Sequence, residues 1–449
     1  MGMRILFLFC ALFFLCFARV YPASAQAATQ PECPALRTFL NFRRTAKAGK
    51  LILEELTLTG LKRTSEEFVR DEIGLGVGCE ITLADAEAAA QRLRNTNFFL
   101  SVQLYHEQIS ERGIRLHFVF EEKWTLTPVL RGGTGGGVSF FVLGLYDINA
   151  LGAGIESGAQ YEQYAGSPGF VVWWRDPHIG TRDWRLSLEF ARVTRPAYFL
   201  NSEDNEFYKP LQRSTRFSAI GFRRFGRWDV GLGLEPMHRN LEATELKAPS
   251  FYPGFTSDPG TTLGLKAILR YNNVNLDDFR LQGWRSDWSL DWLAPLRQPL
   301  SSNPLLRLTT QNLFFKNLGE RQNLGLRLQG GWVSGGRLLD LFRLGSLDGV
   351  RGLLDGERAG RVVWMVNSEY RYATYLSPWL AVQNVVFADT GNSGVDFNRW
   401  PTHAALSVGT GVRIGFRPIA RLRVRADYAH GLRNMLQKHN VVVGMQQYF

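Results

Sequence analysis

The sequence predicts an α+β domain followed by a 16-stranded antiparallel transmembrane β-barrel. Polarity alternates with period two through most of the chain after residue 124, as strands with one apolar and one polar face require. Glycine supplies 45 of the 449 residues and aromatic residues 13%, a composition that leans towards β-structure. The chain also begins with a segment typical of exported proteins. Together these three observations favour a barrel in an outer membrane.

Composition excludes several other classes of protein. Charged residues make up 21% and hydrophobic residues 45%, which excludes a disordered chain, a collagen and a helical membrane bundle. The 52 basic residues exceed the 41 acidic residues, so the net charge is +11. Mean hydropathy is −0.14, which is low for several spanning helices but fits a barrel whose alternate residues face water.

Residues 1–25 have the features of a secretory signal peptide. A basic Arg4 precedes the apolar run Ile5–Ala18, and Ala23-Ser24-Ala25 fits a cleavage site. The alternative is an N-terminal membrane anchor, but the apolar run is shorter than the roughly 20 residues that span a bilayer. We therefore expect a mature chain that starts at residue 26, with a linker over 26–50.

The remaining cysteines and the missing motifs limit the chemistry. Cys10 and Cys16 leave with the signal, whereas Cys33 and Cys79 stay and could form a disulfide in an oxidising periplasm. No histidine or cysteine has metal-ligand spacing, and neither a Gly-x-Ser-x-Gly elbow nor a phosphate loop is present. We therefore expect no enzyme activity, no metal and no cofactor.

Residues 51–123 are predicted to form the small domain. Leu51–Leu58 alternates as a strand, and Thr64-Ser65-Glu66-Glu67 fits a capping box that opens a helix. A second box, Thr82-Leu83-Ala84-Asp85, opens another helix. Two alternating strands, 99–108 and 114–121, follow around a turn at residues 112 and 113. The predicted order is β-α-α-β-β.

This small domain resembles a POTRA domain. The element order, the length of about 70 residues, the Gly60-Leu61-Lys62-Arg63-Thr64 turn and the Phe98-Phe99-x-x-Val102 entry to the second strand carry the resemblance. POTRA domains stand in the periplasm before the barrels of BamA/TamA-type assembly proteins and two-partner-secretion transporters. The alternative is a small α/β domain of unrelated purpose.

Residues 124–449 are predicted to form the barrel. In Leu422–Ala429 the apolar Leu422, Val424, Ala426 and Tyr428 alternate with Arg423, Arg425 and Asp427. A soluble sandwich would bury the apolar face instead and is the alternative. The predicted strands are 126–134, 138–148, 152–165, 169–177, 183–194, 213–225, 228–239, 261–272, 283–294, 304–316, 322–333, 361–373, 378–389, 403–416, 421–430 and 440–449. The long gaps between them all fall at one end, as in outer-membrane barrels with short periplasmic turns and longer external loops.

Local motifs in the barrel resemble the same superfamily, which includes the bacterial surface antigen family. Val350-Arg351-Gly352 in the sixth loop resembles its Val-Arg-Gly motif, and Phe387-Ala388-Asp389-Thr390-Gly391 resembles its Phe-x-Asp-x-Gly motif. Asp147–Gly152, Tyr271–Asn273 with Gly283, and the terminal Tyr448-Phe449 match its second-strand exit, a strand turn and a C-terminal assembly signal. Leu353 departs from it, because an aromatic residue usually follows Arg-Gly.

The resemblance implies an outer-membrane polypeptide transporter or insertase with a single periplasmic POTRA domain. Expected partners are the outer-membrane lipid bilayer, unfolded β-rich polypeptide clients, and periplasmic chaperones or accessory lipoproteins, but no nucleic acid. Glycine weakens a strand, so Gly132, Gly133, Gly135, Gly136 and Gly137 predict a weak seam between the first and last strands, and the resemblance implies that clients enter there. The alternatives are a passive porin-like or surface-antigen barrel and an enzyme tethered by a barrel.

The sharpest structural expectation concerns Arg351. Alternation in strand 361–373 places Glu369 and Arg371 in the lumen, and Asp389 shares the inward face of its strand with Phe387. The planar guanidinium of arginine can hold a carboxylate at two points and stays charged when partly buried. We therefore expect an Arg351 nitrogen within about 4 Å of an Asp389 or Glu369 oxygen. The alternative is three ordinary lumen or loop charges.

Overall fold

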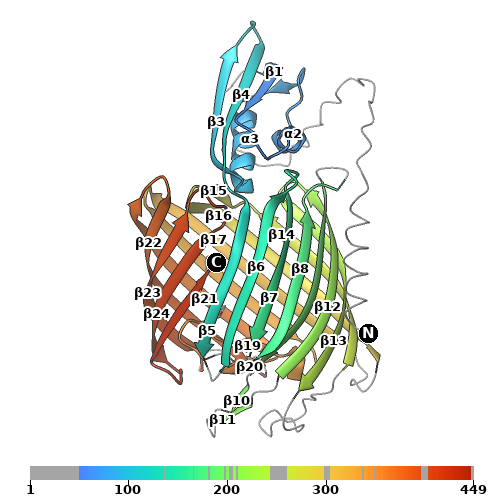
Figure 1. The fold of residues 1–449 in the computed structure, drawn as a ribbon, viewed down its shortest axis with the longest axis vertical. Helices are drawn as coiled ribbons and strands as arrows, with labels where there is room; N and C mark the ends of the chain where they lie inside the picture. Colours follow the sequence, from blue (N-terminus) through green and yellow to red (C-terminus); the bar gives the residue numbers. More distant parts are fainter. Residues whose placement is uncertain are drawn as a thin grey trace.

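The computed structural model shows a small N-terminal domain standing over one end of a closed β-barrel (Figure 1). It describes residues 50–135, 138–164, 166–179, 183–196, 199–201, 206–208, 211–242, 260–297, 304–335, 338–346, 349–354, 356–395 and 403–445. The expected signal peptide, nearly all of the expected linker, Cys33, Gly136, Gly137, Tyr448 and Phe449 lie outside these residues. No helix among the described residues is long and apolar enough to cross a membrane.

The N-terminal domain packs two helices against a four-stranded sheet. Its elements are β1 (Leu51–Thr59), α2 (Glu66–Ile73), β2 (Glu80–Ile81), α3 (Leu83–Thr96), β3 (Phe99–Gln108) and β4 (Gly113–Glu122). The sheet order is β2-β1-β4-β3, with β1 parallel to β4. Leu53, Ile73, Leu93, Leu116 and Phe118 are fully buried in its core. The predicted order is confirmed, and the two-residue β2 is an addition that the sequence analysis missed.

The two helix starts test the predicted capping boxes. The Thr82 box is confirmed, because the Thr82 hydroxyl accepts from the Asp85 N–H while the Asp85 carboxylate accepts from the Thr82 N–H. The first box is wrong by one residue. Ser65 is the N-cap of α2 and accepts from the Phe68 N–H at 3.1 Å. The Thr64 hydroxyl instead accepts a hydrogen bond from the Asn149 amide of the barrel, so it contacts the barrel and does not cap α2.

The barrel is one closed sheet whose strands pair antiparallel wherever the register is described. Its strands are β5 (Leu126–Gly135), β6 (Val138–Ala150), β7 (Ile155–Tyr164), β8 (Ser167–Asp176), β9 (Trp184–Pro196), β12 (Leu211–Phe225), β13 (Trp228–Glu242), β14 (Gly260–Asn272), β15 (Asn275–Asp277), β16 (Arg280–Arg297), β17 (Leu305–Gly319), β18 (Gln322–Val333), β21 (Val362–Leu376), β22 (Leu380–Gly394), β23 (Ala405–Phe416), β24 (Arg423–Arg433) and β25 (His439–Met445). The described sheet thus has 17 strands rather than the expected 16. The extra one is β15, three residues in the turn between β14 and β16, which also pair directly with each other.

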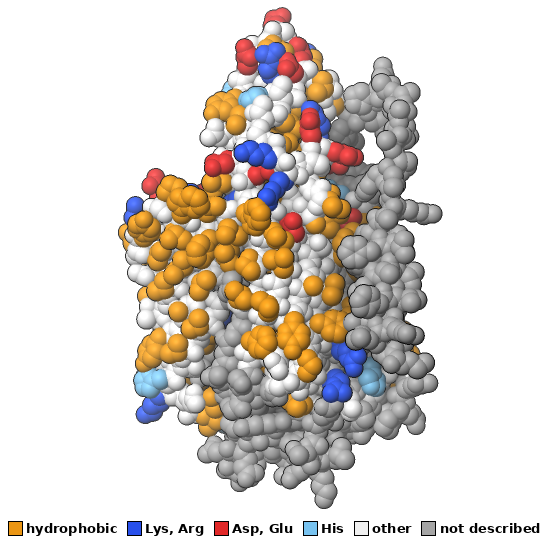
Figure 2. Space-filling view, viewed as in Figure 1, with side chains coloured by type: hydrophobic (Ala, Val, Ile, Leu, Met, Phe, Trp, Pro, Cys, Tyr) orange, Lys and Arg blue, Asp and Glu red, His pale blue; other side chains and the backbone are white. Residues whose placement is uncertain are grey.

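The two faces of the barrel differ as the alternation predicts. Outward residues are apolar and exposed, such as Val441 at 66% and Val443 at 57% on β25. Figure 2 shows hydrophobic side chains spread over the outside of the barrel, with charged side chains gathered on the N-terminal domain. Inward residues include the buried Arg371, Arg413 and Asp427. This inverted arrangement excludes the soluble sandwich, whose apolar face would be inside.

The longer connections between barrel strands join strand ends opposite the N-terminal domain; we call this end of the barrel the loop end and the other the domain end (Figure 1). Several small elements between the barrel strands were not predicted from the sequence. They are the hairpin β10 (Phe199–Asn201) and β11 (Glu206–Tyr208), the 3-10 helix η1 (Leu338–Asp340), and the paired β19 (Phe342–Leu344) and β20 (Arg358–Gly360). Each strand is three residues long, too short to show period-two alternation.

The N-terminal domain contacts the domain end at two sides. On one side, the Ser65 N–H donates to the Gly152 carbonyl at 2.9 Å, and Phe68 of α2 stacks on His178 after β8. On the other side, the Asn95 carboxamide of α3 accepts from the Leu276 N–H of β15 at 2.9 Å. These contacts hold the domain across the mouth of the barrel.

Candidate functional site

The loop between β18 and β21 enters the lumen rather than staying at the surface. Val350 and Leu353 are fully buried and pack with Phe342, Val363 and Met365 in a separate apolar cluster. Leu353, the departure from the family motif, thus fills a buried position. Two strands also hold the loop backbone, because the Asn367 amide donates to the Gly349 carbonyl and the Ser407 hydroxyl donates to the Arg351 carbonyl.

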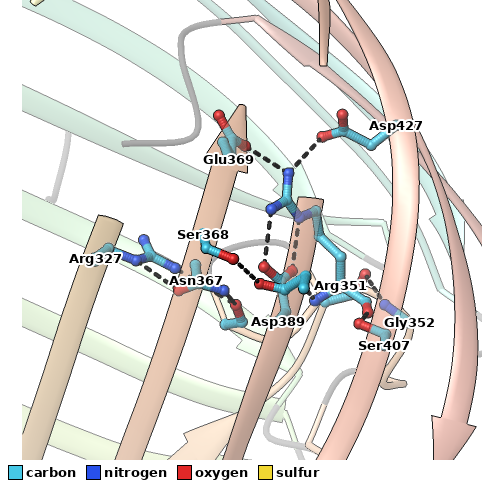
Figure 3. Close-up of polar contacts among 12 residues, drawn as sticks. Arg327, Arg351, Gly352, Asn367, Ser368, Glu369, Asp389, Ser407 and Asp427 are labelled. Atoms are coloured by element: carbon cyan, nitrogen blue, oxygen red, sulfur yellow. Dashed lines mark hydrogen bonds and ion pairs between the residues drawn. The ribbon is translucent and has the colours of Figure 1, made fainter. Parts of the chain in front are cut away.

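Arg351 lies at the centre of this loop and has no exposed surface. Its Nε and Nη2 donate to the two carboxylate oxygens of Asp389 at 2.7 and 2.9 Å, and its backbone N–H donates to the same group (Figure 3). Its Nη1 donates to Glu369 Oε1 at 2.6 Å. The contact expected from the sequence is therefore confirmed, with the two-point geometry that arginine favours.

Further charges surround this contact and complete a group that we call the lumen cluster: Arg351, Arg371, Arg413, Glu369, Asp389 and Asp427. Arg371 bonds Glu369 at 2.7 Å, and Arg413 bonds both Glu369 at 3.0 Å and Asp427 at 2.5 Å. Asp427 also lies 3.6 Å from Arg351. A fourth buried arginine, Arg425, lies 3.8 Å from Asp427, so every carboxylate of the cluster has at least one arginine partner.

Aromatic and glycine residues of the two motifs shape the pocket around Arg351. The Arg351 guanidinium carbon lies 3.5 Å from the centre of the Phe387 ring, within the range of a cation–π contact. Gly352 has φ of +109°, a conformation that side chains disfavour. A Cβ at Gly391 would come within 3.0 Å of the Val350 side chain. The structure thus brings Val350, Arg351, Gly352, Glu369, Phe387, Asp389 and Gly391 to one site.

The fold of this chain is similar to the folds of several solved structures. BamA from Haemophilus ducreyi lacking POTRA domains 1–3 is similar at 17% identity and a TM-score of 0.50, over 88% of this chain and 84% of that one. CdiB from Acinetobacter baumannii is similar at 15% identity and a TM-score of 0.55, over 89% of this chain and 73% of that one. CdiB from Escherichia coli is similar at 10% identity and a TM-score of 0.54, over 91% of this chain and 92% of that one. This chain has the BamA/CdiB barrel fold. No protein-family model and no curated protein matches the sequence.

Within this BamA/CdiB fold, β5 and β25 are the strands that close the barrel. Gly132, Gly133 and Gly135 lie in β5, where they pair with Phe141, Phe140 and Val138 of β6. Just before β5, Trp124 exchanges two backbone hydrogen bonds of 2.8 Å with Pro418 and Ala420 in the turn between β23 and β24. The first strand is therefore anchored at the domain end, and weakness of the seam stays a prediction.

The N-terminal domain of this fold has one long strand edge, β3, whose backbone is bonded by Arg94 of α3 at Val102. Among the described residues β3 pairs on one side, with β4, and the opposite edge of the sheet is the two-residue β2. Tyr105 on β3 is 55% exposed. Such an edge presents backbone N–H and C=O groups that another extended chain can pair with.

One further predicted site, the disulfide, has a partial outcome. Cys79 is disulfide-bonded, whereas its expected partner Cys33 lies outside the described residues, so their pairing stays a prediction. Across the part of the chain that the structure describes, no group of three or more His, Cys, Asp or Glu residues could hold a metal ion.

Proposed function

We propose that this protein is an outer-membrane polypeptide transporter or insertase. Its N-terminal domain would act as a periplasmic POTRA domain that captures unfolded β-rich clients. The barrel would then insert or translocate them, with the seam between β5 and β25 opening to admit client strands. The observation that carries the proposal is the long β3 edge on a domain that stands over the barrel mouth.

The physical argument for capture is strand addition. An unfolded β-rich client has backbone N–H and C=O groups without partners. An edge strand can form hydrogen bonds with these groups whatever the sequence of the client. The apolar outer surface of the barrel supports a membrane location, with the domain end facing the periplasm and the loop end facing outside. The fold shared with BamA and CdiB supports the same class of function.

Two features disfavour a passive porin-like or surface-antigen barrel. Such a barrel would be expected to carry its sixth loop on the surface and to have a covered strand edge on its N-terminal domain. Here the sixth loop is buried in the lumen through Arg351, and β3 is an edge strand of its sheet.

Site-specific photo-crosslinking on the full-length protein tests capture. A photo-activatable residue at Tyr105 should crosslink to an unfolded barrel polypeptide, because a client strand paired with β3 would lie beside it. The matched control is Glu80, whose side chain is also exposed but lies on β2, at the opposite edge of the sheet. Equal crosslinking at the two positions, or none at Tyr105, would contradict capture by the β3 edge.

A further inference from the structure

A cavity of about 720 Å³ lies at the domain end of the lumen, and it shares no lining residue with the lumen cluster. Asn95 and Asn97 of the N-terminal domain line one side of it. Inward residues of the barrel line the rest, including residues of β5, β8, β16 and β24. The cavity thus lies between the domain proposed to capture clients and the barrel wall.

The lining of the cavity carries an excess of positive charge. Four arginines, Arg175, Arg285, Arg421 and Arg423, face two glutamates, Glu156 and Glu189. The glutamates do not neutralise the arginines one by one, because Glu156 bonds both Arg421, at 2.7 Å, and Arg175. Among the lining side chains, the arginines therefore outnumber the carboxylates by two, around a volume large enough for a ligand.

Arg423 differs from the other three lining arginines. Arg285 bonds Asp287 at 2.6 Å, and Arg175 and Arg421 bond Glu156. The described residues provide Arg423 with neither a hydrogen bond nor an ion pair, although it is partly buried and lines the cavity. A guanidinium in that position can hold a carboxylate through two parallel hydrogen bonds.

The rest of the lining suits a peptide. Trp173, Tyr146 and Phe315 supply aromatic surface, while the Gln160 amide and the Asn97 amide nitrogen can pair with a peptide backbone. Pockets of roughly 300–1,000 Å³ accommodate small ligands, so this volume can accept a few residues of an extended chain.

The geometry points to a binding site for a carboxylate-bearing segment of an extended polypeptide, with Arg423 holding an Asp or Glu side chain and the aromatic residues contacting its apolar neighbours. This inference rests on the proposed function and refines it, since it names the chemistry of the client segment that pauses at the barrel mouth. It adds a second contact, by side chains, to the backbone pairing proposed for β3.

The test measures peptide binding to the full-length protein in detergent by fluorescence anisotropy. The probe is a labelled, end-blocked peptide with two Asp and two Phe residues, compared with the same peptide carrying Asn in place of Asp. Wild-type protein should bind the Asp peptide at least tenfold more tightly than the Asn peptide. The substitution Arg423→Gln should remove that preference, and Arg423→Lys should restore part of it.

The matched control is Arg361→Gln at the loop end, where Arg361 donates to the Val395 carbonyl; it should bind the Asp peptide as the wild type does. Equal affinity of wild-type protein for the Asp and Asn peptides would overturn the inference, and this comparison needs no variant to fold. Inorganic phosphate provides a second arm. Displacement of both peptides alike by millimolar phosphate, without an Asp preference, would assign the cavity to phosphate and also overturn it.

The design separates this inference from the proposed function. Client assembly that persists in Arg423→Gln, together with no Asp preference in the wild type, would remove the cavity site and leave the transporter proposal standing. An Arg423-dependent preference for the Asp peptide, in a protein that assembles no client, would support the cavity site and overturn the transporter proposal.

Discussion

Two regions of the barrel lumen use inward arginines in different ways. In the lumen cluster, Arg351 is fully buried and bonds two carboxylates, and Arg371 and Arg413 bond carboxylates as well. At the domain end, Arg423 borders a cavity and has no bonded partner among the described residues. The first arrangement fixes a loop in the lumen, whereas the second leaves a charge available to a ligand.

The difference shows why residue type alone does not assign a role inside a barrel. Both arginines lie on the inward side, and alternation in the sequence places Arg423 there as well. The two arginines differ in their surroundings. A fully buried charge must be paired, whereas a charge that faces a polar cavity can be left unpaired until a ligand binds. Changes in the lumen cluster, at the domain end and at Arg423 test this difference.

The largest effect is expected in the lumen cluster, for Arg351→Ala. Removing the guanidinium leaves Glu369 and Asp389 buried with fewer partners, at a cost of about 3–5 kcal/mol in the free energy of unfolding. The loop should leave the lumen and become sensitive to trypsin, and activity should suffer more than membrane insertion. The matched control is Arg358→Ala in the same loop, where the side chain donates to the Asn434 carbonyl. A wild-type protease pattern in Arg351→Ala would contradict the assigned role of the cluster.

The second prediction concerns the docking of the N-terminal domain. Gly152 has φ of +72°, and a Cβ there would lie 2.1 Å from the Arg63 carbonyl oxygen. Gly152→Ala should therefore separate the domain from the barrel, which hydrogen exchange of the Ser65 amide would report, since that amide bonds the Gly152 carbonyl. Gly166→Ala is the control, because Gly166 has φ of +78° but open space around it, so that change costs only the roughly 1–2 kcal/mol of a left-handed side chain. Unchanged exchange at Ser65 in Gly152→Ala would show that this contact does not hold the domain.

The third prediction is a pH dependence at the junction of the two parts. Burial lowers the pKa of Lys123 from 10.5 to about 8, against the attraction of Asp278 and with help from Arg423 and Arg417. Between pH 8 and 10.5 the unfolded chain binds more protons at this group than the folded chain, so stability should rise with pH in that window. The slope is at most about 1.4 kcal/mol per pH unit.

Urea unfolding of the full-length protein between pH 8 and 10 provides the measurement for this third prediction. Lys123→Met removes the titrating amine, so the wild type should gain stability relative to this variant as the pH rises. Parallel pH profiles for the two proteins would mean that the folded pKa of Lys123 is not depressed.

The smallest effect is expected for Arg423→Gln on stability. No ion pair is lost there, so the free energy of unfolding should change by about 0.5 kcal/mol or less, in contrast to Arg351→Ala. Urea unfolding of the two variants side by side tests the comparison directly. Destabilisation of Arg423→Gln by as much as Arg351→Ala would show that Arg423 also has a structural role.

Much of the fold could be predicted because each membrane-type strand has its own alternating pattern in the local sequence. A strand with one outward apolar face and one inward polar face alternates over ten or more residues, and each predicted barrel segment overlaps an observed strand. The short β15, β19 and β20 could not be found this way, since three residues contain too little alternation. The N-cap of α2 was misplaced to Thr64 because Thr64 and Ser65 are both good caps, and a distant contact with Asn149 decides between them.

The site could be predicted only in part. Arg351, Glu369 and Asp389 were found together because two motifs and the strand parity point to the same lumen. The bonds of Arg413 and Asp427 to this group were not predicted. Alternation along a strand shows that these side chains face inward, but it does not give their position along the barrel axis relative to Glu369. That position depends on the stagger between strands, which no local sequence pattern contains. The contact of Phe68 with His178 was missed for the same reason, as it joins residues far apart in the chain.

Locking the seam between β5 and β25 shows whether the barrel moves polypeptides through it, as we propose. Cysteines introduced on β5 and β25 would form a disulfide when oxidised, and assembly of an unfolded client barrel into liposomes would be measured before and after reduction. A cysteine pair at Ala219 and Leu234, which are directly paired on β12 and β13, controls for oxidation itself. The oxidised seam variant should be folded but inactive and should recover on reduction, while the control pair should be active throughout. Full client assembly by the oxidised seam variant would contradict this proposal.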